Sequence, residues 1–384
     1  MGVSIKGISQ ISLTANSNPV QLSTGESTLA CVRDNVKQIL PTLEFRFLDI
    51  SNSFSNNKVA DGSTLDVVIG DGNTQSSTLN FLSFGSPHKS PCSLGYLYNV
   101  HGIGSMAPIL RECPSAAIEG TSLDVFKQAA TKFNLTLKTN LNSTDDNMVW
   151  RPGRQSWGTF LRYVANHAYS RDGGFISTAI DSEKNLYLMD VPQVFAQTDI
   201  SAIIYNGNPQ FSTAINTQTK IPCIQYKHIN RAGFHNNTEG FGSRVSQTDP
   251  ITGDVGKYSK VKAQTSGNNL DISSNIYKTI NQNAKLSIAP INSGNGHDNY
   301  IKARHQNNRL QTTYSNNLYV LLSGYSKLPL YSKVYFKAGN TDNYDEATVG
   351  FYILTGKVRF VKGGRYFEKI ELTNSGPATG EGIL

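Results

Sequence analysis

The chain has 384 residues, of which 38% are hydrophobic, 10% are aromatic and only 16% are charged. This hydrophobic content excludes a chain that is disordered overall, and no long run rich in Ala, Glu, Lys and Leu is present to form a coiled coil. The formal net charge of +7 is uneven, because residues 1–195 hold 15 basic and 16 acidic side chains (net −1), whereas residues 196–384 hold 20 and 12 (net +8).

Residues 1–114 have the pattern of a first β-barrel domain. Apolar and polar residues alternate over 42–47 and again over 64–69, and this period of two places one set of side chains in a core. A third apolar run covers 79–84. Asp61-Gly62 and Asp71-Gly72 separate the runs and predict turns.

Residues 115–192 predict a small inserted α/β domain with two helices. Thr121 or Ser122 can cap the first helix and Ser156 the second, and a hairpin is expected over 175–180 and 185–189. Apolar residues recur at helical spacing in both segments. We expect the core of this domain to be formed by Leu123, Phe126, Phe133, Trp157, Phe160, Leu161 and Val164.

Residues 193–375 predict a second β-barrel domain that contains a long polar insertion at about 231–314. Short strands are expected at 200–205, 223–228, 318–322 and 333–337, and a hairpin at 350–361 and 365–372 across Lys362-Gly363-Gly364. We expect the polar insertion to be an excursion or a helical patch that packs only in an assembly. Residues 376–384 have the composition of a flexible tail. The fold class is therefore mainly β (α+β), with two barrels around an α/β insert.

Motifs for catalysis, cofactors or metals are weak. No histidine lies in an HExxH pair, and His167 lies off the apolar stripe of its helix. The calcium-like spacing of 181–185 has Leu186 where an EF-hand needs glycine. The carboxylates of Glu112, Glu119, Asp145 and Asp146 are expected to be solvated. We predict no catalytic residue, cofactor or metal, and, without an apolar run near 18 residues, no membrane insertion.

Three groups of segments, in this order, resemble the baseplate hub proteins of contractile-tailed bacteriophages (the tail-hub or late-control family). The hub half of type VI secretion spike proteins is similar. The first group is Leu43–Asp49 with Asp61–Gly70, which is similar to the opening strands of the family. The second group, residues 119–135, 155–165 and 186–190, is similar to the inserted helices and the closing strand of the family. The third group, residues 330–336, 350–354 and 363–372, is similar to the last barrel strands of the family.

The resemblance implies a non-enzymatic structural protein of the virion. It implies a homotrimer whose six barrels join the hexameric tail tube to the trimeric central spike, with other baseplate proteins around it and DNA passing through its channel only in transit. Assembly is expected in the host cytoplasm. Since a DNA channel is better lined with neutral or acidic groups, we expect much of the +8 to face outward or toward a partner. The alternatives are a tail-associated cell-wall hydrolase or cell-wall-binding protein, and a type VI secretion spike hub.

Overall fold

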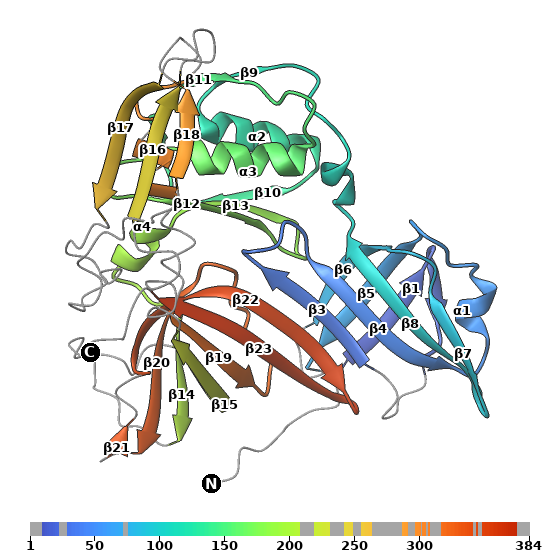
Figure 1. Ribbon diagram of the computed structural model, residues 1–384. Coiled ribbons are helices and arrows are strands. Elements are labelled where there is room, and N and C mark those ends of the chain that lie inside the picture. The colour runs from blue at the N-terminus through green and yellow to red at the C-terminus, as the bar shows by residue number, and fades with distance from the viewer. Residues whose placement is uncertain are drawn as a thin grey trace.

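A computed structural model (Figure 1) describes residues 10–22, 29–71, 76–207, 219–230, 242–248, 255–262, 286–290, 296–300, 302–304, 306–307, 316–340, 343–344 and 348–374. The fold is mainly β, and its largest sheet has 15 strands. Among the described helices, none has the length and apolar character needed to cross a membrane. The strand content confirms the expected fold class, which is mainly β with few helices.

The N-terminal β region folds around one apolar core. Its sheet order is β2-β1-β5-β6-β8-β4-β3, and β7 pairs with β8. Alternate residues of these strands, such as Phe45, Phe47, Val67 and Ile69, are fully buried, as the period-two pattern predicts. The elements are β1 (Gln10–Ala15), β2 (Asn18–Val20), β3 (Leu29–Asn35), β4 (Thr42–Asp49), α1 (Ser53–Asn56), β5 (Thr64–Gly70), β6 (Ser76–Ser83), β7 (His88–Cys92), β8 (Gly95–Gly104) and the 3-10 helix η1 (Ala107–Leu110).

The insert has the two predicted helices and the predicted hairpin. Thr121 caps the first helix by a capping box with Asp124, and Ser156 caps the second. In Figure 1 the two helices lie over a small sheet of order β10-β13-β12. The elements are β9 (Ile118–Gly120), α2 (Ser122–Lys132), β10 (Thr136–Thr139), β11 (Met148–Trp150), α3 (Trp157–His167), β12 (Ile176–Ile180), β13 (Asn185–Asp190) and α4 (Val191–Ala196).

The C-terminal β region contains a closed barrel of six strands. Its pairs run β14-β15-β19-β23-β22-β20 and return from β20 to β14. Gly363 and Gly364 both have positive φ, which permits the tight turn of the predicted β22–β23 hairpin. The elements are β14 (Ala202–Gly207), β15 (Lys220–Asn230), β19 (Asn316–Leu322), β20 (Lys333–Asn340), β21 (Asn343–Tyr344), β22 (Gly350–Lys362) and β23 (Arg365–Asn374).

Strand β22 connects the two β regions into one sheet. It closes the C-terminal barrel through β20 and β23, and it also pairs antiparallel with β3 over seven residue pairs, from Gly356↔Asn35 to Lys362↔Leu29. Val361 and Tyr366 from this hairpin complete the N-terminal core. The domain limits 1–114, 115–192 and 193–375 stay a prediction, because this strand serves both β regions.

The polar insertion differs in part from the sequence prediction, because it contains strands. Strands β16 (Gly242–Thr248), β17 (Val255–Lys262) and β18 (Leu286–Pro290) form a separate three-stranded sheet. The described residues between 296 and 307 pack on the insert within the same chain, so for these residues the expectation of packing only in an assembly is wrong. The predicted tail 376–384 lies outside the described residues.

Candidate functional site

A buried ionic cluster lies where the two β regions and the insert meet. Arg359 of β22 has a fully buried side chain, and its two terminal nitrogens donate to Asp34 Oδ2 at 3.0 Å and Glu183 Oε1 at 3.1 Å. Asp34 belongs to β3, and Glu183 belongs to the turn between β12 and β13. One side chain therefore binds groups from three parts of the fold.

Ser182 completes this junction. Its backbone N–H donates to Asp34 Oδ1 at 2.8 Å, its hydroxyl donates to Asp34 Oδ2 at 2.9 Å, and Arg359 also contacts that hydroxyl. Burial alone would lower the pKa of Arg359, but the carboxylates of Asp34 and Glu183 raise it above its ordinary value. The guanidinium therefore stays charged, and removing one partner would leave a buried charge uncompensated.

The calcium-like spacing at 181–185 is a turn stabilised by Asp181. The Asp181 carboxylate accepts from the backbone N–H groups of Glu183 and Asn185, from the Asn185 amide and from the Tyr187 hydroxyl, at 2.8–2.9 Å. Burial raises the pKa of this carboxyl group, against the effect of the Asn185 and Tyr187 hydrogen bonds. Both oxygens are thus occupied by donors of the hairpin that carries Ser182 and Glu183.

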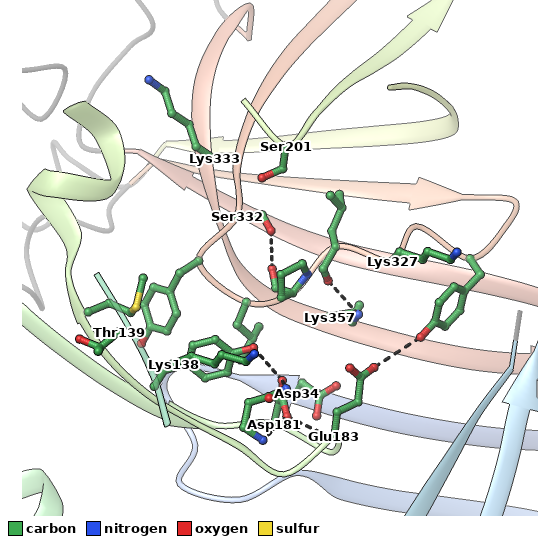
Figure 2. A pocket seen from close by; sticks show the side chains of 18 of the residues that line it. Asp34, Lys138, Thr139, Asp181, Glu183, Ser201, Lys327, Ser332, Lys333 and Lys357 are labelled. Atoms are coloured by element: carbon green, nitrogen blue, oxygen red, sulfur yellow. Dashed lines mark hydrogen bonds between the residues drawn. The ribbon is translucent and has the colours of Figure 1, made fainter. Parts of the chain in front are cut away.

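A cleft of about 830 Å³ opens beside the junction, between the insert and the loop before β20. Figure 2 shows the lysines around it. The Lys357 ammonium donates to the Leu328 carbonyl at 2.9 Å, and Lys333 donates to the carbonyls of Phe195 and Gln197. Burial lowers the pKa of Lys333. These two lysines therefore fix the backbone of the cleft walls.

The cleft offers little chemistry for hydrolysis. A glycosidase needs an acid and a second carboxylate that are free to act on the bond between them. The three carboxylates lining the cleft are those of Asp34, Asp181 and Glu183. Asp34 and Glu183 accept hydrogen bonds from Arg359, and Asp181 accepts hydrogen bonds from donors of its own hairpin. The arrangement fits a structural joint.

Six of the seven predicted core residues of the insert are buried together. Phe126, Phe160 and Val164 have no exposed surface, and Leu123, Trp157 and Leu161 are at most 5% exposed. Phe133 is only half-buried at the end of α2, with its ring 6.1 Å from that of Trp157 in an edge contact. The indole N–H of Trp157 is buried without a hydrogen-bond partner among the described residues.

One expectation about the carboxylates of the insert is wrong. Asp146 is fully buried, because its carboxylate accepts from the backbone N–H groups of Ser122 and Tyr169, whereas it was expected to be solvated. His167 is also buried, and its ring lies 4.4 Å from the ring of Tyr163 and 4.5 Å from that of Tyr300. The other three carboxylates, of Glu112, Glu119 and Asp145, are at least partly exposed.

The end of the polar insertion covers this part of the insert. His297 Nε2 donates to the His167 carbonyl at 2.9 Å. The amide of Asn307 donates to the carbonyls of Ala165 and Ala168 and accepts from the Ile176 N–H. No periodic pattern marks 296–307 in the sequence, so these contacts could not be predicted from it.

Comparison with known proteins identifies the fold. No family model matches the sequence, and no curated protein matches it. Among solved structures, a tail protein from Neisseria meningitidis is similar over 97% of this chain and 100% of its own, with a TM-score of 0.58 and 11% identity. The 43 kDa tail protein of prophage MuSo2 from Shewanella oneidensis is similar over 96% of this chain and 98% of its own, with a TM-score of 0.56 and 11% identity.

A type VI secretion component is similar as well. This Escherichia coli protein, described as structurally similar to the T4 phage tail proteins gp27 and gp5, matches over 97% of this chain and 80% of its own, with a TM-score of 0.50 and 11% identity. The chain thus has the fold of phage tail and secretion-spike proteins, and the resemblance expected from the sequence is confirmed at the level of the fold.

Proposed function

We propose that this protein is the structural hub of a contractile-tail baseplate. Three chains would form a ring of pseudo-six-fold character that joins the hexameric tail tube to the trimeric central spike and encloses part of the DNA channel. The observation that carries the proposal is the single sheet through both β regions, joined by the seven pairs of β3 and β22.

This sheet supplies what a symmetry adaptor needs. Because the two β regions share β22 and are bound together by Arg359, their relative position is fixed within one chain. Three such chains would place six β regions in a ring, with the two kinds alternating. Strand β7 is exposed along its whole length, and edge strands of this kind can pair with neighbouring chains.

The composition supports large polar contacts. Only 16% of residues are charged, and the chain has 18 tyrosines, a residue type enriched at protein interfaces. We further propose that the role is non-enzymatic, because the carboxylates of the cleft are used in structural contacts. Zymography on peptidoglycan tests this part: no clearing band is expected, and a band that survives purification would favour the cell-wall hydrolase.

The oligomeric state tests the hub proposal directly. Light scattering coupled to size exclusion should give three times the 42.0 kDa chain mass for the protein alone, or a complex that contains three copies of the chain after addition of the tail tube and spike proteins of the same phage. Imaging of the particle should then place the chain between tube and spike. A chain that stays monomeric with both proteins, or that is missing from the mature tail, would contradict the proposal.

A second candidate is the hub part of a type VI secretion spike. The match to the Escherichia coli component, over 97% of this chain, favours it. The same images separate the two candidates, since a phage hub is found in particles that contain a DNA-filled head, and a secretion hub is found at the tip of a headless sheath.

A further inference from the structure

The surplus positive charge gathers on one face of the shared sheet. Residues opposite each other in paired strands point to the same side of a sheet, so the register defines rows across β4, β3, β22 and β23. The row nearest the β22–β23 turn contains Arg46, Leu29, Lys362 and Arg365. Its three basic side chains are exposed, and none forms a salt bridge with a described carboxylate.

The neighbouring rows extend this face. The next one holds Glu44 with the stacked rings of Phe360 and Phe367, whose centroids are 5.4 Å apart. The third pairs Arg33 with Val358 and Val358 with Lys369.

The fourth row contains Glu371 of β23 and Tyr319 of β19. Lys227 of β15 continues this row, but β15 lies three strands from β22 around the closed barrel, so Lys227 faces away from β3 and β4. At about 4.8 Å between strands and 3.3 Å per residue, the four rows cover a patch about 14 Å wide over β4, β3, β22 and β23 and about 20 Å long. We call this patch the basic sheet face.

The charges of the basic sheet face are unbalanced. With Lys37, which pairs with Glu371 at 2.7 Å, the basic sheet face holds six basic and two acidic side chains, a net of +4 against +7 for the whole chain. Arg33 pairs with Glu44 at 2.9 Å. Four cations of this face remain without a carboxylate among the described residues: Arg46, Lys362, Arg365 and Lys369. From the sequence we expected this surplus to face outward or toward a partner; the register places it on one continuous surface.

We propose that the basic sheet face binds the phosphate backbone of duplex DNA without sequence preference. The proposal rests on the proposed function, in which DNA passes through the hub, and it replaces the expectation from the sequence that this charge faces away from the DNA channel. Phosphates lie along DNA at one charge per about 1.7 Å, so a patch of this size meets several of them at once. Such contacts are weak at physiological salt and allow DNA to slide, which suits a strand that must be held and then released.

The test measures DNA binding by the full chain in solution. A fluorescent 30-base-pair duplex is titrated with protein at several NaCl concentrations between about 50 and 200 mM, and the dissociation constant is read from anisotropy. The test variant is Arg46→Gln/Lys362→Gln/Arg365→Gln. The matched control is Arg151→Gln/Arg154→Gln/Arg162→Gln, three exposed arginines of the insert that remove the same net charge.

The test variant should bind at least about tenfold more weakly at 50 mM NaCl, and its plot of log affinity against log salt should flatten by about three, one for each lost phosphate contact. The control should stay within about twofold of the wild type. Equal losses in both variants would mean binding by overall charge and would overturn the proposal. So would a wild type that does not bind at 50 mM NaCl, which would leave an acidic protein as the partner of this face.

This result is separate from the test of the hub itself. A chain that forms the trimer and enters the tail but does not bind the duplex defeats this inference alone. A monomer that is missing from the particle, yet binds the duplex through Arg46, Lys362 and Arg365, defeats the hub proposal alone.

Discussion

The two β regions build their cores from different sources. The buried residues of the N-terminal core come from its own strands and from α1, apart from Val361 and Tyr366 of the β22–β23 hairpin. The C-terminal core extends into the insert, which contributes Phe175, Ala179, Tyr187, Val191, Val194 and Phe195. A change in the insert should therefore disturb the C-terminal barrel, whereas the N-terminal region should be affected chiefly through the junction at Arg359.

Removing the junction at Arg359 should have the largest effect on both β regions. Arg359→Ala leaves Asp34 buried without its counter-charge, and we expect a loss of about 3–5 kcal/mol in the free energy of unfolding. Urea unfolding followed by far-UV circular dichroism measures it across all strands, and tryptophan fluorescence measures it in the insert, because Trp150 and Trp157 are the chain's only tryptophans. Both transitions should shift together.

Arg33→Ala is the matched control for that variant. Arg33 lies on the neighbouring strand, is 43% exposed and pairs with Glu44, so its loss should cost less than about 1 kcal/mol. If the two variants unfold at the same urea concentration, the buried cluster does not bind the regions together.

The second prediction concerns the core of the insert. Phe160→Ala removes a ring with no exposed surface and should cost about 3–5 kcal/mol, seen as an earlier loss of tryptophan fluorescence. Phe133→Ala, at the half-buried edge of the same cluster, should cost clearly less. A Phe160→Ala protein that melts like the wild type would mean that the helices are packed differently.

Acid should weaken the contact between α3 and residues 296–307. Burial lowers the pKa of His167 to about 4, so the unfolded chain binds a proton between pH 6.5 and 4 that the folded chain does not. Stability from this group is present above pH 6.5 and is lost as the pH falls toward 4, by about 3 kcal/mol in all. His167→Asn should flatten this dependence of the urea midpoint, whereas His101→Asn, at an exposed position, should keep it.

The smallest effect is expected at Asn307. Asn307→Ala removes three hydrogen bonds to α3 and β12, and we expect a loss of about 2 kcal/mol confined to that contact. Hydrogen exchange should rise at the Ile176 N–H, which loses its acceptor. Gln306→Ala, which removes one exposed hydrogen bond, should leave that exchange unchanged; equal protection in both variants would refute the role of Asn307.

Local pattern predicted most of the elements. The N-terminal strands alternate apolar and polar residues, the insert helices have capping residues and a continuous apolar stripe, and the Gly363-Gly364 turn marks the last hairpin. All three signals lie within about ten residues of the structure that they specify. The order of these elements was enough to suggest the fold.

The junction and the basic sheet face could not be predicted in this way. Alternation along β22 suggests that Val358 and Phe360 face a core and that Lys357 and Arg359 face solvent, but Lys357 and Arg359 are buried and the two apolar residues are only partly so. The reversal has a long-range cause, since the acceptors of Arg359 are on β3 and on the insert. The residues next to Arg359 in the sequence give no signal that predicts those partners.

The shared strand β22 also determines at which point of its synthesis the chain can complete its fold. Arg359 and Asp34 are 325 positions apart, so β3 emerges from the ribosome long before β22 exists to cover its free edge. At typical rates of synthesis of about 5–20 residues per second, the edge of β3 stays without its partner strand for roughly 15–65 seconds. An uncovered strand invites pairing with the wrong chain, and the yield of active protein should therefore depend on chaperones and on expression at low temperature.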